Sequence, residues 1–336
     1  MNMKKKFRIL QILGLLLLFV PKTAEAAMRF GIRGVLPENQ VGQGHDFFHL
    51  LLEPSEIQEI EIILTNETDE EITALIDIVT ATTNPNGLVE YAWRDVEQDS
   101  SLLFPMEDIV TGPDTVLLPI DEPISVFLTI TMPSKSLEGV LAGGITFMEV
   151  DTEEEEVAEG MTILNRFAFT QAIILRNSTQ GVPAEFVLNE IVPTQQGMRT
   201  HISGNIQNTS PRFVNQVRAE AFVTVYGEDE VLFENIMESV QFAPNSNFDF
   251  MIPMDGERLN PGRFTWHMTL STENDTWKFQ SDFEIESETA RHFNEQDISI
   301  QPESRNWLTI SLIIGGAVVL IGTNIGTIVY FKKRNK

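Results

Sequence analysis

The sequence predicts a mainly β protein: two tandem immunoglobulin-like β-sandwich domains followed by one C-terminal transmembrane α-helix. Apolar and polar residues alternate with a period of two through the middle of the chain, and Pro, Gly, Asn or Asp bounds each run. This pattern is typical of half-buried strands. The runs form two successive groups of about seven, the strand number of such a sandwich. A stretch of 24 residues without a formal charge, Leu308 to Phe331, then closes the chain.

Residues 1–26 have the features of a signal peptide. A basic segment at 4–8 precedes an apolar stretch of 12 residues, Ile9 to Val20, and the cleavage pattern Ala24-Glu25-Ala26 follows. Twelve residues are too few to span about 30 Å of hydrocarbon. We therefore expect export and a mature chain that begins at Ala27.

The first sandwich is predicted over residues 27–177. Its clearest strands contain the alternating apolar sets Ile60, Ile62, Leu64; Ile72, Ala74, Ile76, Ile78; and Ile124, Val126, Leu128, Ile130, Met132. One face of each strand would meet the opposing sheet and the other would meet water. The last two strands are expected at 139–150 and 166–177. The acidic run 151–156 between them is interpreted as a hairpin loop; its alternative interpretation, a linker, would move the boundary to 150–160.

The second sandwich is predicted over residues 178–290. Seven runs with strand-like alternation are found at 184–194, 198–209, 212–227, 229–240, 246–254, 262–272 and 276–286. No long helical periodicity follows them. We therefore expect loop or linker from 287 to 306, with 291–306 as a juxtamembrane linker.

The terminal apolar segment is predicted to span a membrane, as residues 307–331, with a cytoplasmic tail at 332–336. Trp307 and Tyr330 suit the two interfaces, and the basic cluster Lys332, Lys333 and Arg334 should remain inside the cell. The motif Leu-Pro-x-Thr-Gly, which directs sortase attachment to the wall, is missing upstream of the span. We therefore expect a permanent single-pass anchor in the cell membrane, with the preceding domains outside.

Charge and cysteine content restrict the possible partners. The whole chain has a formal net charge of −26, and residues 27–306 hold 14 basic and 48 acidic residues. So acidic a surface repels nucleic acid, and we expect no nucleic-acid partner. The chain has no cysteine, which favours a Gram-positive surface over a eukaryotic one and excludes thiolate nucleophiles and thiolate metal sites.

No catalytic, cofactor-binding or metal site is predicted. The sequence contains no G-x-S-x-G elbow, P-loop, S-x-x-K or H-E-x-x-H motif. His45 and His49 have the spacing of two ligands on one helical face, but they flank an aromatic pair in a segment expected to be extended. A carboxylate pair for glycoside hydrolysis stays open, because separation in space decides its chemistry.

Two loops carry candidate binding residues. Glu38, Asn39 and Gln40 follow Pro37, and Asn84 and Asn86 lead to Tyr91 and Trp93. Amide-rich loops beside aromatic rings can hold sugars or peptides through hydrogen bonds and a flat apolar surface. The alternative is that Asn and Gly serve the turns while Tyr91 and Trp93 fill the core. The sequence leaves both open.

Several short motifs together resemble the family of WxL-interacting proteins. The first half matches through LPENQ (36–40), TNPNGLVEY (83–91), MP (132–133) and GVLAGGI (139–145). The second half matches through APNSNF (243–248), LNPGRF (259–264), WKF (277–279) and ARHFN (290–294). One departure is His45-Asp46-Phe47-Phe48-His49, where a Gly-Tyr-Phe-like segment is commoner in the family.

The resemblance implies a surface protein of low-GC Gram-positive bacteria, with a peptidoglycan-binding domain followed by a host-binding domain. It further implies assembly with WxL-domain proteins and contact with an extracellular host ligand. Glu38, Asn39, Gln40, Asn84, Asn86 and Tyr91 would then be the candidate peptidoglycan-binding residues. The expected function is a non-enzymatic, membrane-anchored scaffold or adhesin. The alternatives are a wall-active hydrolase with an unrecognised carboxylate pair, or a purely structural spacer.

Overall fold

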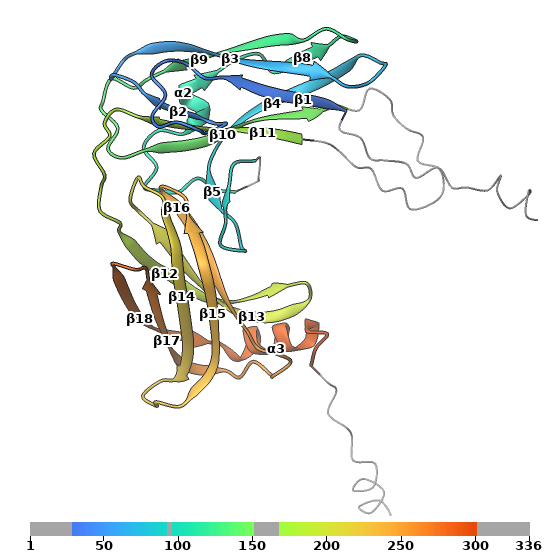
Figure 1. The fold of residues 1–336 in the computed structure, drawn as a ribbon. Helices are drawn as coiled ribbons and strands as arrows, with labels where there is room; N and C mark the ends of the chain where they lie inside the picture. The colour runs from blue at the N-terminus through green and yellow to red at the C-terminus, as the bar shows by residue number, and fades with distance from the viewer. Residues whose placement is uncertain (1–28, 93–95, 151–167, 301–336) are drawn as a thin grey trace, which may run out of the picture.

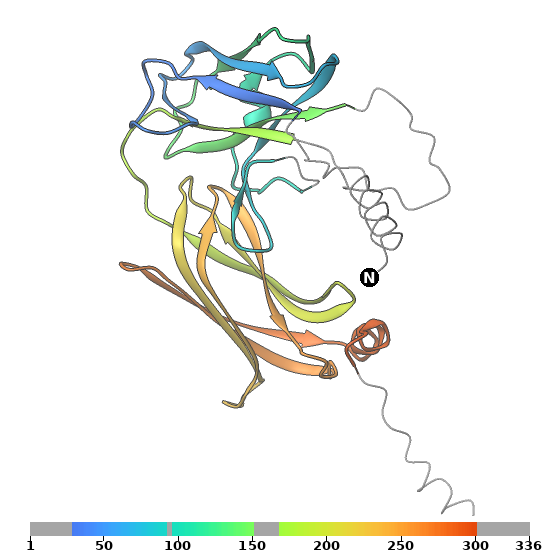
Figure 2. The ribbon, with the colours of Figure 1, turned by 45° about the vertical axis from the view of Figure 1, so that its right-hand side comes forward.

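The computed structural model describes residues 29–92, 96–150 and 168–300. Two β-rich domains lie one above the other in Figure 1, and Figure 2 shows the same arrangement after a turn of 45°. The mainly β, two-domain architecture predicted from the sequence is confirmed. Within the described ranges, no helix combines the length and the apolar character needed to cross a membrane. The expected signal peptide at 1–26, the acidic run at 151–156, the span at 307–331 and the tail at 332–336 lie outside them.

The first domain is a sandwich of a four-stranded and a five-stranded sheet. The four-stranded sheet has the order β1 (Phe30–Val35), β3 (Ile57–Asn66), β9 (Ile124–Thr131) and β7 (Val110–Thr111). The five-stranded sheet has the order β2 (Phe48–Leu51), β11 (Ala168–Arg176), β10 (Leu141–Glu149), β4 (Ile72–Thr80) and β8 (Thr115–Leu118). All neighbours are antiparallel except β2 and β11.

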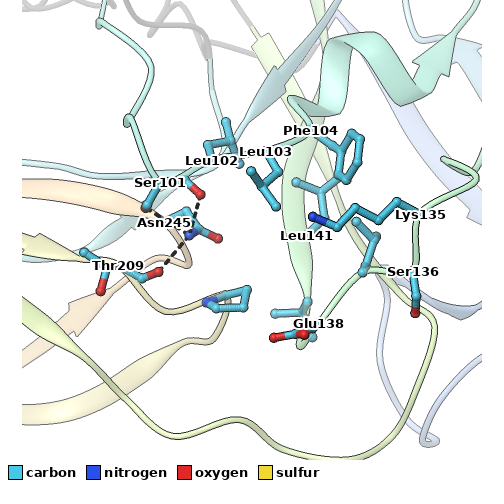
Figure 3. Close-up of a pocket in the computed structure, with 13 residues that line it drawn as sticks. Ser101, Leu102, Leu103, Phe104, Lys135, Ser136, Glu138, Leu141, Thr209 and Asn245 are labelled. Atoms are coloured by element: carbon cyan, nitrogen blue, oxygen red, sulfur yellow. Dashed lines mark hydrogen bonds between the residues drawn. The ribbon is translucent and has the colours of Figure 1, made fainter.

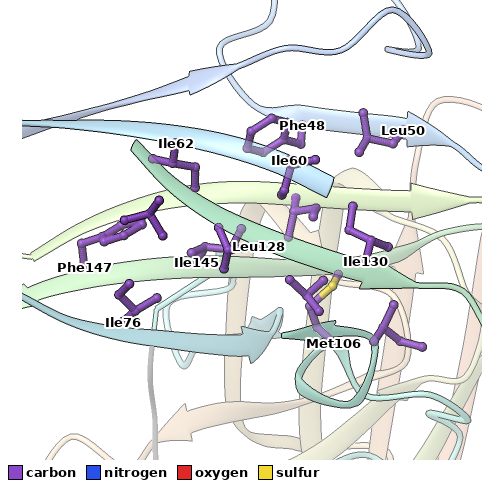
Figure 4. Close-up of a cluster of buried hydrophobic side chains, with 14 of the residues drawn as sticks. Phe48, Leu50, Ile60, Ile62, Ile76, Met106, Leu128, Ile130, Ile145 and Phe147 are labelled. Atoms are coloured by element: carbon purple, nitrogen blue, oxygen red, sulfur yellow. The ribbon is translucent and has the colours of Figure 1, made fainter. Parts of the chain in front are cut away.

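The core of this sandwich follows the predicted alternation. Ile60, Ile62 and Leu64 of β3 are buried, whereas the residues between them are partly exposed. Figure 4 shows side chains from both sheets meeting in the space between them, with Met106 contributed by the short helix α2 (Met106–Ile109). Removing this apolar surface from water stabilises the stacked sheets.

The second domain is a sandwich of three-stranded and four-stranded sheets. The three-stranded sheet has the order β12 (Phe186–Gln196), β13 (Arg199–Asn208) and β16 (Ser246–Pro253). The four-stranded sheet has the order β15 (Val231–Phe242), β14 (Val214–Val225), β17 (Gly262–Ser271) and β18 (Thr276–Ile285). These strands correspond to the seven predicted runs. Their order is that of an immunoglobulin-type sandwich whose fourth strand has joined the sheet of the third.

Residues 287–296 form the helix α3 (Ser287–Gln296), so the prediction of loop or linker is wrong there. Ala290 is 2% exposed, and Phe293 packs against the core of the second sandwich. The Asn294 side chain donates to the carbonyl of Leu259 and accepts from its N–H, both at 2.8 Å. The helix forms because these tertiary contacts fix it, although the sequence shows no long amphipathic pattern.

The two sandwiches share an interface, here called the domain junction. Its apolar centre contains Ala81, Ala142, Ile174 and Ala243, with Tyr91 among the side chains packed against it. A small hairpin of β5 (Thr82–Thr83) and β6 (Val89–Glu90) projects from the first sandwich into this region (Figure 1).

Polar contacts complete the domain junction. The carboxylate of Asp99, which is 7% exposed, accepts from Gln207 Nε2 at 2.9 Å and from Asn247 Nδ2 at 2.5 Å. The hydroxyls of Thr83 and Ser246 are 2.8 Å apart and buried. Buried polar groups of one sandwich are therefore satisfied by the other.

Candidate ligand-binding surfaces

The loop between β1 and β2 holds the first group of predicted binding residues. Asn39 Nδ2 donates to Gln58 Oε1 at 2.8 Å, and Gln58 Nε2 donates to Asn39 Oδ1 at 3.2 Å. Gln40 Nε2 donates to the carbonyl of Phe47 at 2.7 Å, while its Oε1 accepts from the N–H of His49 at 3.1 Å. Both amides therefore hold the loop in shape. Glu38, in contrast, is exposed.

The two histidines near this loop have different surroundings. The ring of His45 lies 4.8 Å from that of Phe47, whereas His49 Nε2 lies 3.5 Å from the Arg176 guanidinium. Burial, with the charges of Arg176 and His45, lowers the pKa of His49. The positive charge of Arg176 opposes a cation at His49. The described residues include no cluster of three or more His, Asp or Glu side chains suited to a metal ion.

The β5–β6 hairpin holds the second group. Asn84 Oδ1 accepts from the N–H groups of Asn86 and Leu88, at 2.9 and 3.2 Å, and so shapes the turn. The carbonyl of Gly87 accepts from the N–H of Gln241 at 2.7 Å, which fixes the hairpin tip to the second sandwich. Asn86 is exposed beside it.

Tyr91 lies partly buried against the apolar centre of the domain junction. Burial raises the pKa of its hydroxyl. This position agrees with the alternative in which Tyr91 serves packing. Trp93 lies outside the described residues. Of the six candidate residues, Glu38 and Asn86 are the two whose side chains are exposed.

A pocket of about 270 Å³ opens at the domain junction (Figure 3). Its walls come from two segments of the first sandwich, 101–104 and 135–141, and two turns of the second. The lining side chains are Ser101, Leu102, Leu103, Phe104, Lys135, Ser136, Leu137, Glu138, Val140, Leu141, Thr209, Pro211 and Asn245. Seven of these are apolar and two are charged. The pocket is here called the junction pocket.

Asn245 is the fixed polar group of the junction pocket. Its Nδ2 donates to the Ser101 carbonyl at 3.2 Å, to Ser101 Oγ at 3.0 Å and to the Thr209 carbonyl at 3.0 Å. Figure 3 shows these three bonds on one side of the side chain and its oxygen turned toward the open pocket. In the sequence, Asn245 stands out only as part of the motif APNSNF (243–248), because no linear pattern brings it beside Ser101, 144 positions away.

A second pocket of about 360 Å³ adjoins the junction and is acidic. Asp77, Glu97, Asp99 and Glu107 are among its lining residues. Burial and the nearby charge of Glu107 raise the pKa of Asp77, against a hydrogen bond from the Ile78 N–H. Thr80 Oγ1 donates to Glu107 at 2.9 Å. This pocket therefore brings several carboxylates together in a concave site.

Comparisons with known proteins identify both halves of the chain. Residues 30–149 match the family model described as "WxL Interacting Protein, peptidoglycan binding domain". Residues 158–295 match the model described as "WxL Interacting Protein, host binding domain". The second match begins before β11, a strand that pairs with β10 of the first sandwich. No curated protein matches the chain.

Among solved structures, the chain is distantly similar to fimbrial chaperones. The Pseudomonas aeruginosa CupB2 chaperone is 11% identical, with a TM-score of 0.29, over 70% of this chain and 96% of that chain. The CsuC-CsuE chaperone-tip adhesion subunit pre-assembly complex of Acinetobacter baumannii matches at 10% identity and a TM-score of 0.30, over 66% of this chain and 90% of that chain. A PapD-like domain of human CEP192 matches at 15% identity and a TM-score of 0.28, over 49% of this chain and 93% of that chain.

Proposed function

Because the two family models match in this order, the chain belongs to the WxL-interacting proteins, and we propose that it is a non-enzymatic, membrane-anchored scaffold or adhesin of the Gram-positive cell surface. The observation that carries the proposal is the match of residues 30–149 to a peptidoglycan-binding domain. Both matched models describe binding domains, which favours a non-catalytic role.

In this proposal, peptidoglycan is bound by the two amide-rich loops of the first sandwich. Glu38 and Asn86 would contact the wall polymer directly, because both are exposed. Asn39, Gln40, Asn84 and Tyr91 would hold these two loops in shape, a role supported by their hydrogen bonds within the loops and by the packing of Tyr91.

The second sandwich would bind a WxL-domain protein or an extracellular host ligand. The outer face of its four-stranded sheet supports this role. The rings of Phe222 and His267 stack there with centroids 4.5 Å apart, and Ile236 of the neighbouring strand is 44% exposed. Phe222 and His267 are partly exposed, and apolar and aromatic side chains that reach the surface on one face are typical of interaction surfaces.

The anchor would be the apolar segment 307–331, with the sandwiches outside the cell and residues 332–336 in the cytoplasm. Its length, its interfacial Trp307 and Tyr330, and its basic tail support this topology. We further propose the boundary between the two sandwiches at 177/178. The pairing of β11 with β10 and β2 supports this boundary over one near 150–160.

Co-sedimentation with purified peptidoglycan tests the first role. We expect residues 27–300, which contain both hydrophobic cores, to pellet with sacculi, and Glu38→Ala with Asn86→Ala to reduce the pelleted fraction. The matched control carries Glu228→Ala and Asn274→Ala, an exposed acid and an exposed amide in turns of the second sandwich. Pelleting no greater than that of an unrelated acidic domain would contradict the proposal.

The same fragment separates the two alternatives. Release of soluble muropeptides would favour hydrolysis, and Asp77 and Glu107 are the carboxylates to substitute first. Absence of binding to both wall and WxL-domain partner, in cells whose surface complexes still require the chain, would favour a structural spacer.

A further inference from the structure

Lys135 is a cation without an ion-pair partner among the described residues, although the protein is strongly acidic. It lies in the loop between β9 and β10 and lines the junction pocket. Figure 3 shows its amino group extended into the space between the two sandwiches. An unpaired ammonium group at a pocket mouth attracts a carboxylate and can bond it with charge assistance.

Two further polar groups face the same space. Glu138, on the same loop as Lys135, supplies a carboxylate. Asn245 supplies its side-chain oxygen, because its side-chain nitrogen already donates to Ser101 and Thr209 (Figure 3). Both groups can accept hydrogen bonds from the N–H groups of a peptide. The junction pocket therefore offers one cation for an acidic end and two acceptors for a backbone.

The loop that carries Lys135 and Glu138 is held from two sides. The N–H of Leu137 donates to Asn177 Oδ1 at 2.5 Å, and the N–H of Val140 donates to the carbonyl of Pro211 at 2.8 Å. Gly139 has φ +67°, and a Cβ there would lie 2.0 Å from the Pro211 oxygen. The backbone of this loop is thus positioned before any ligand arrives, which lowers the entropy cost of binding.

The remaining walls of the junction pocket are apolar. Leu102, Leu103, Phe104, Leu137, Val140, Leu141 and Pro211 provide them, and Leu103 is 68% exposed. The volume of about 270 Å³ lies just below that of typical ligand pockets, which run from about 300 Å³ upward. It suits a few small apolar side chains and is too small for an extended polymer.

We propose that the junction pocket binds the free carboxylate end of a short peptide with small apolar side chains. Lys135 pairs with the terminal carboxylate, Glu138 and Asn245 accept from the peptide N–H groups, and the leucines and Pro211 contact the side chains. Peptide stems of peptidoglycan that end in D-Ala-D-Ala have this chemistry. The choice of peptidoglycan stems as the source of the peptide rests on the proposed peptidoglycan-binding function. The proposal that the pocket binds a carboxylate-ended peptide rests on the pocket alone.

Titration calorimetry of the full-length chain in detergent tests the assignment. The probe is diacetyl-Lys-D-Ala-D-Ala, and its comparison is the same peptide with a C-terminal amide. We expect the acid to bind about 10-fold more tightly than the amide, as a partly exposed charge-assisted hydrogen bond allows. Lys135→Met should remove that preference, because it should weaken binding of the acid peptide and leave the affinity for the amide peptide nearly unchanged.

Lys278→Met is the matched control, because Lys278 is the other lysine in the described residues and lies on the edge strand β18. It should keep the preference for the acid, and both variants should keep the melting temperature, since both lysines are exposed. Equal binding of the acid and amide peptides by the wild-type chain overturns the proposal. An equal loss of affinity for the acid peptide in Lys135→Met and Lys278→Met also overturns it.

The two proposals can fail separately. If the protein pellets normally with sacculi but does not bind the peptide, the proposal for the junction pocket alone is overturned. Failure of both would overturn peptidoglycan binding as well. Binding of a peptide-free glycan that Lys135→Met weakens would assign the pocket to sugar and also overturn the proposal.

Discussion

At the scale of single residues, Asp297 shows how a buried carboxylate fastens the end of a domain. It is 7% exposed and accepts from the N–H groups of Thr200 and Ser299, both at 2.8 Å. Burial alone would raise its pKa, but the hydrogen bonds from Ser299 and Thr200 outweigh that effect and lower the pKa to about 2. The ionised form is therefore the one that the fold stabilises.

This carboxylate makes stability depend on pH in a defined window. Its folded pKa of about 2 lies below the ordinary value of 3.8, so its contribution is complete above about pH 5 and is lost as the pH falls through about 2. We expect the stability difference between wild type and Asp297→Asn to shrink over that range. Urea unfolding at several pH values measures it, and a difference that stays constant with pH would contradict the assignment.

Individual polar residues also mark the limit of prediction from sequence. Asp99, Gln207 and Asn247 lie in stretches that read as solvated turns or strand faces, yet they meet at the domain junction. Lys135 is likewise one charge in a polar loop. Their roles depend on partners far away in the chain, and no local pattern encodes such partners.

At the scale of elements, strands were predicted better than the helix. The strands of the second sandwich bury alternate residues, and burial on one face leaves a period-two pattern in the sequence. In α3, Ala290 is the one buried residue, and Phe293 is the other apolar contact with the core. So short an apolar face gives no periodicity to read. The two-residue strands β5, β6 and β7 are equally too short for a pattern.

The docking of α3 should depend on Asn294. Asn294→Ala removes both hydrogen bonds to Leu259 and leaves that backbone without these partners, so we expect the second sandwich to lose about 1–2 kcal/mol. Chemical unfolding measures the loss, and hydrogen exchange should show faster exchange of the α3 amides. Glu295→Ala, at the exposed neighbouring position, is the control. Equal effects of the two changes would show that the helix docks by other contacts.

At the scale of the whole molecule, hydrogen bonds and apolar contacts at the domain junction connect the two sandwiches. Side chains of the first satisfy buried amides of the second, and the β5–β6 hairpin is bonded to Gln241. Separating the domains would expose the apolar centre of the domain junction to water and break the hydrogen bonds of Asp99 to Gln207 and Asn247. We therefore expect a single unfolding transition for residues 27–300.

Asp99→Ala should weaken that cooperation. The substitution leaves Gln207 and Asn247 without their shared acceptor, which costs about 2 kcal/mol or more. Calorimetry should then show a lower or divided melting transition. Asp249→Ala is the control, because Asp249 accepts from Asn205 on the exposed part of the same sheet. An unchanged single transition in Asp99→Ala would mean that the apolar contacts alone join the domains.

The close approach of Gly139 to Pro211 has a consequence for how such a protein can change over generations. The contact leaves no room for a side chain, and it joins residues that belong to different family domains. Recombination that exchanges one domain alone would combine a glycine loop and a proline turn that had not been selected together. We therefore expect the glycine and the proline turn to be retained together, whereas side chains that line the neighbouring pocket without touching this contact can vary.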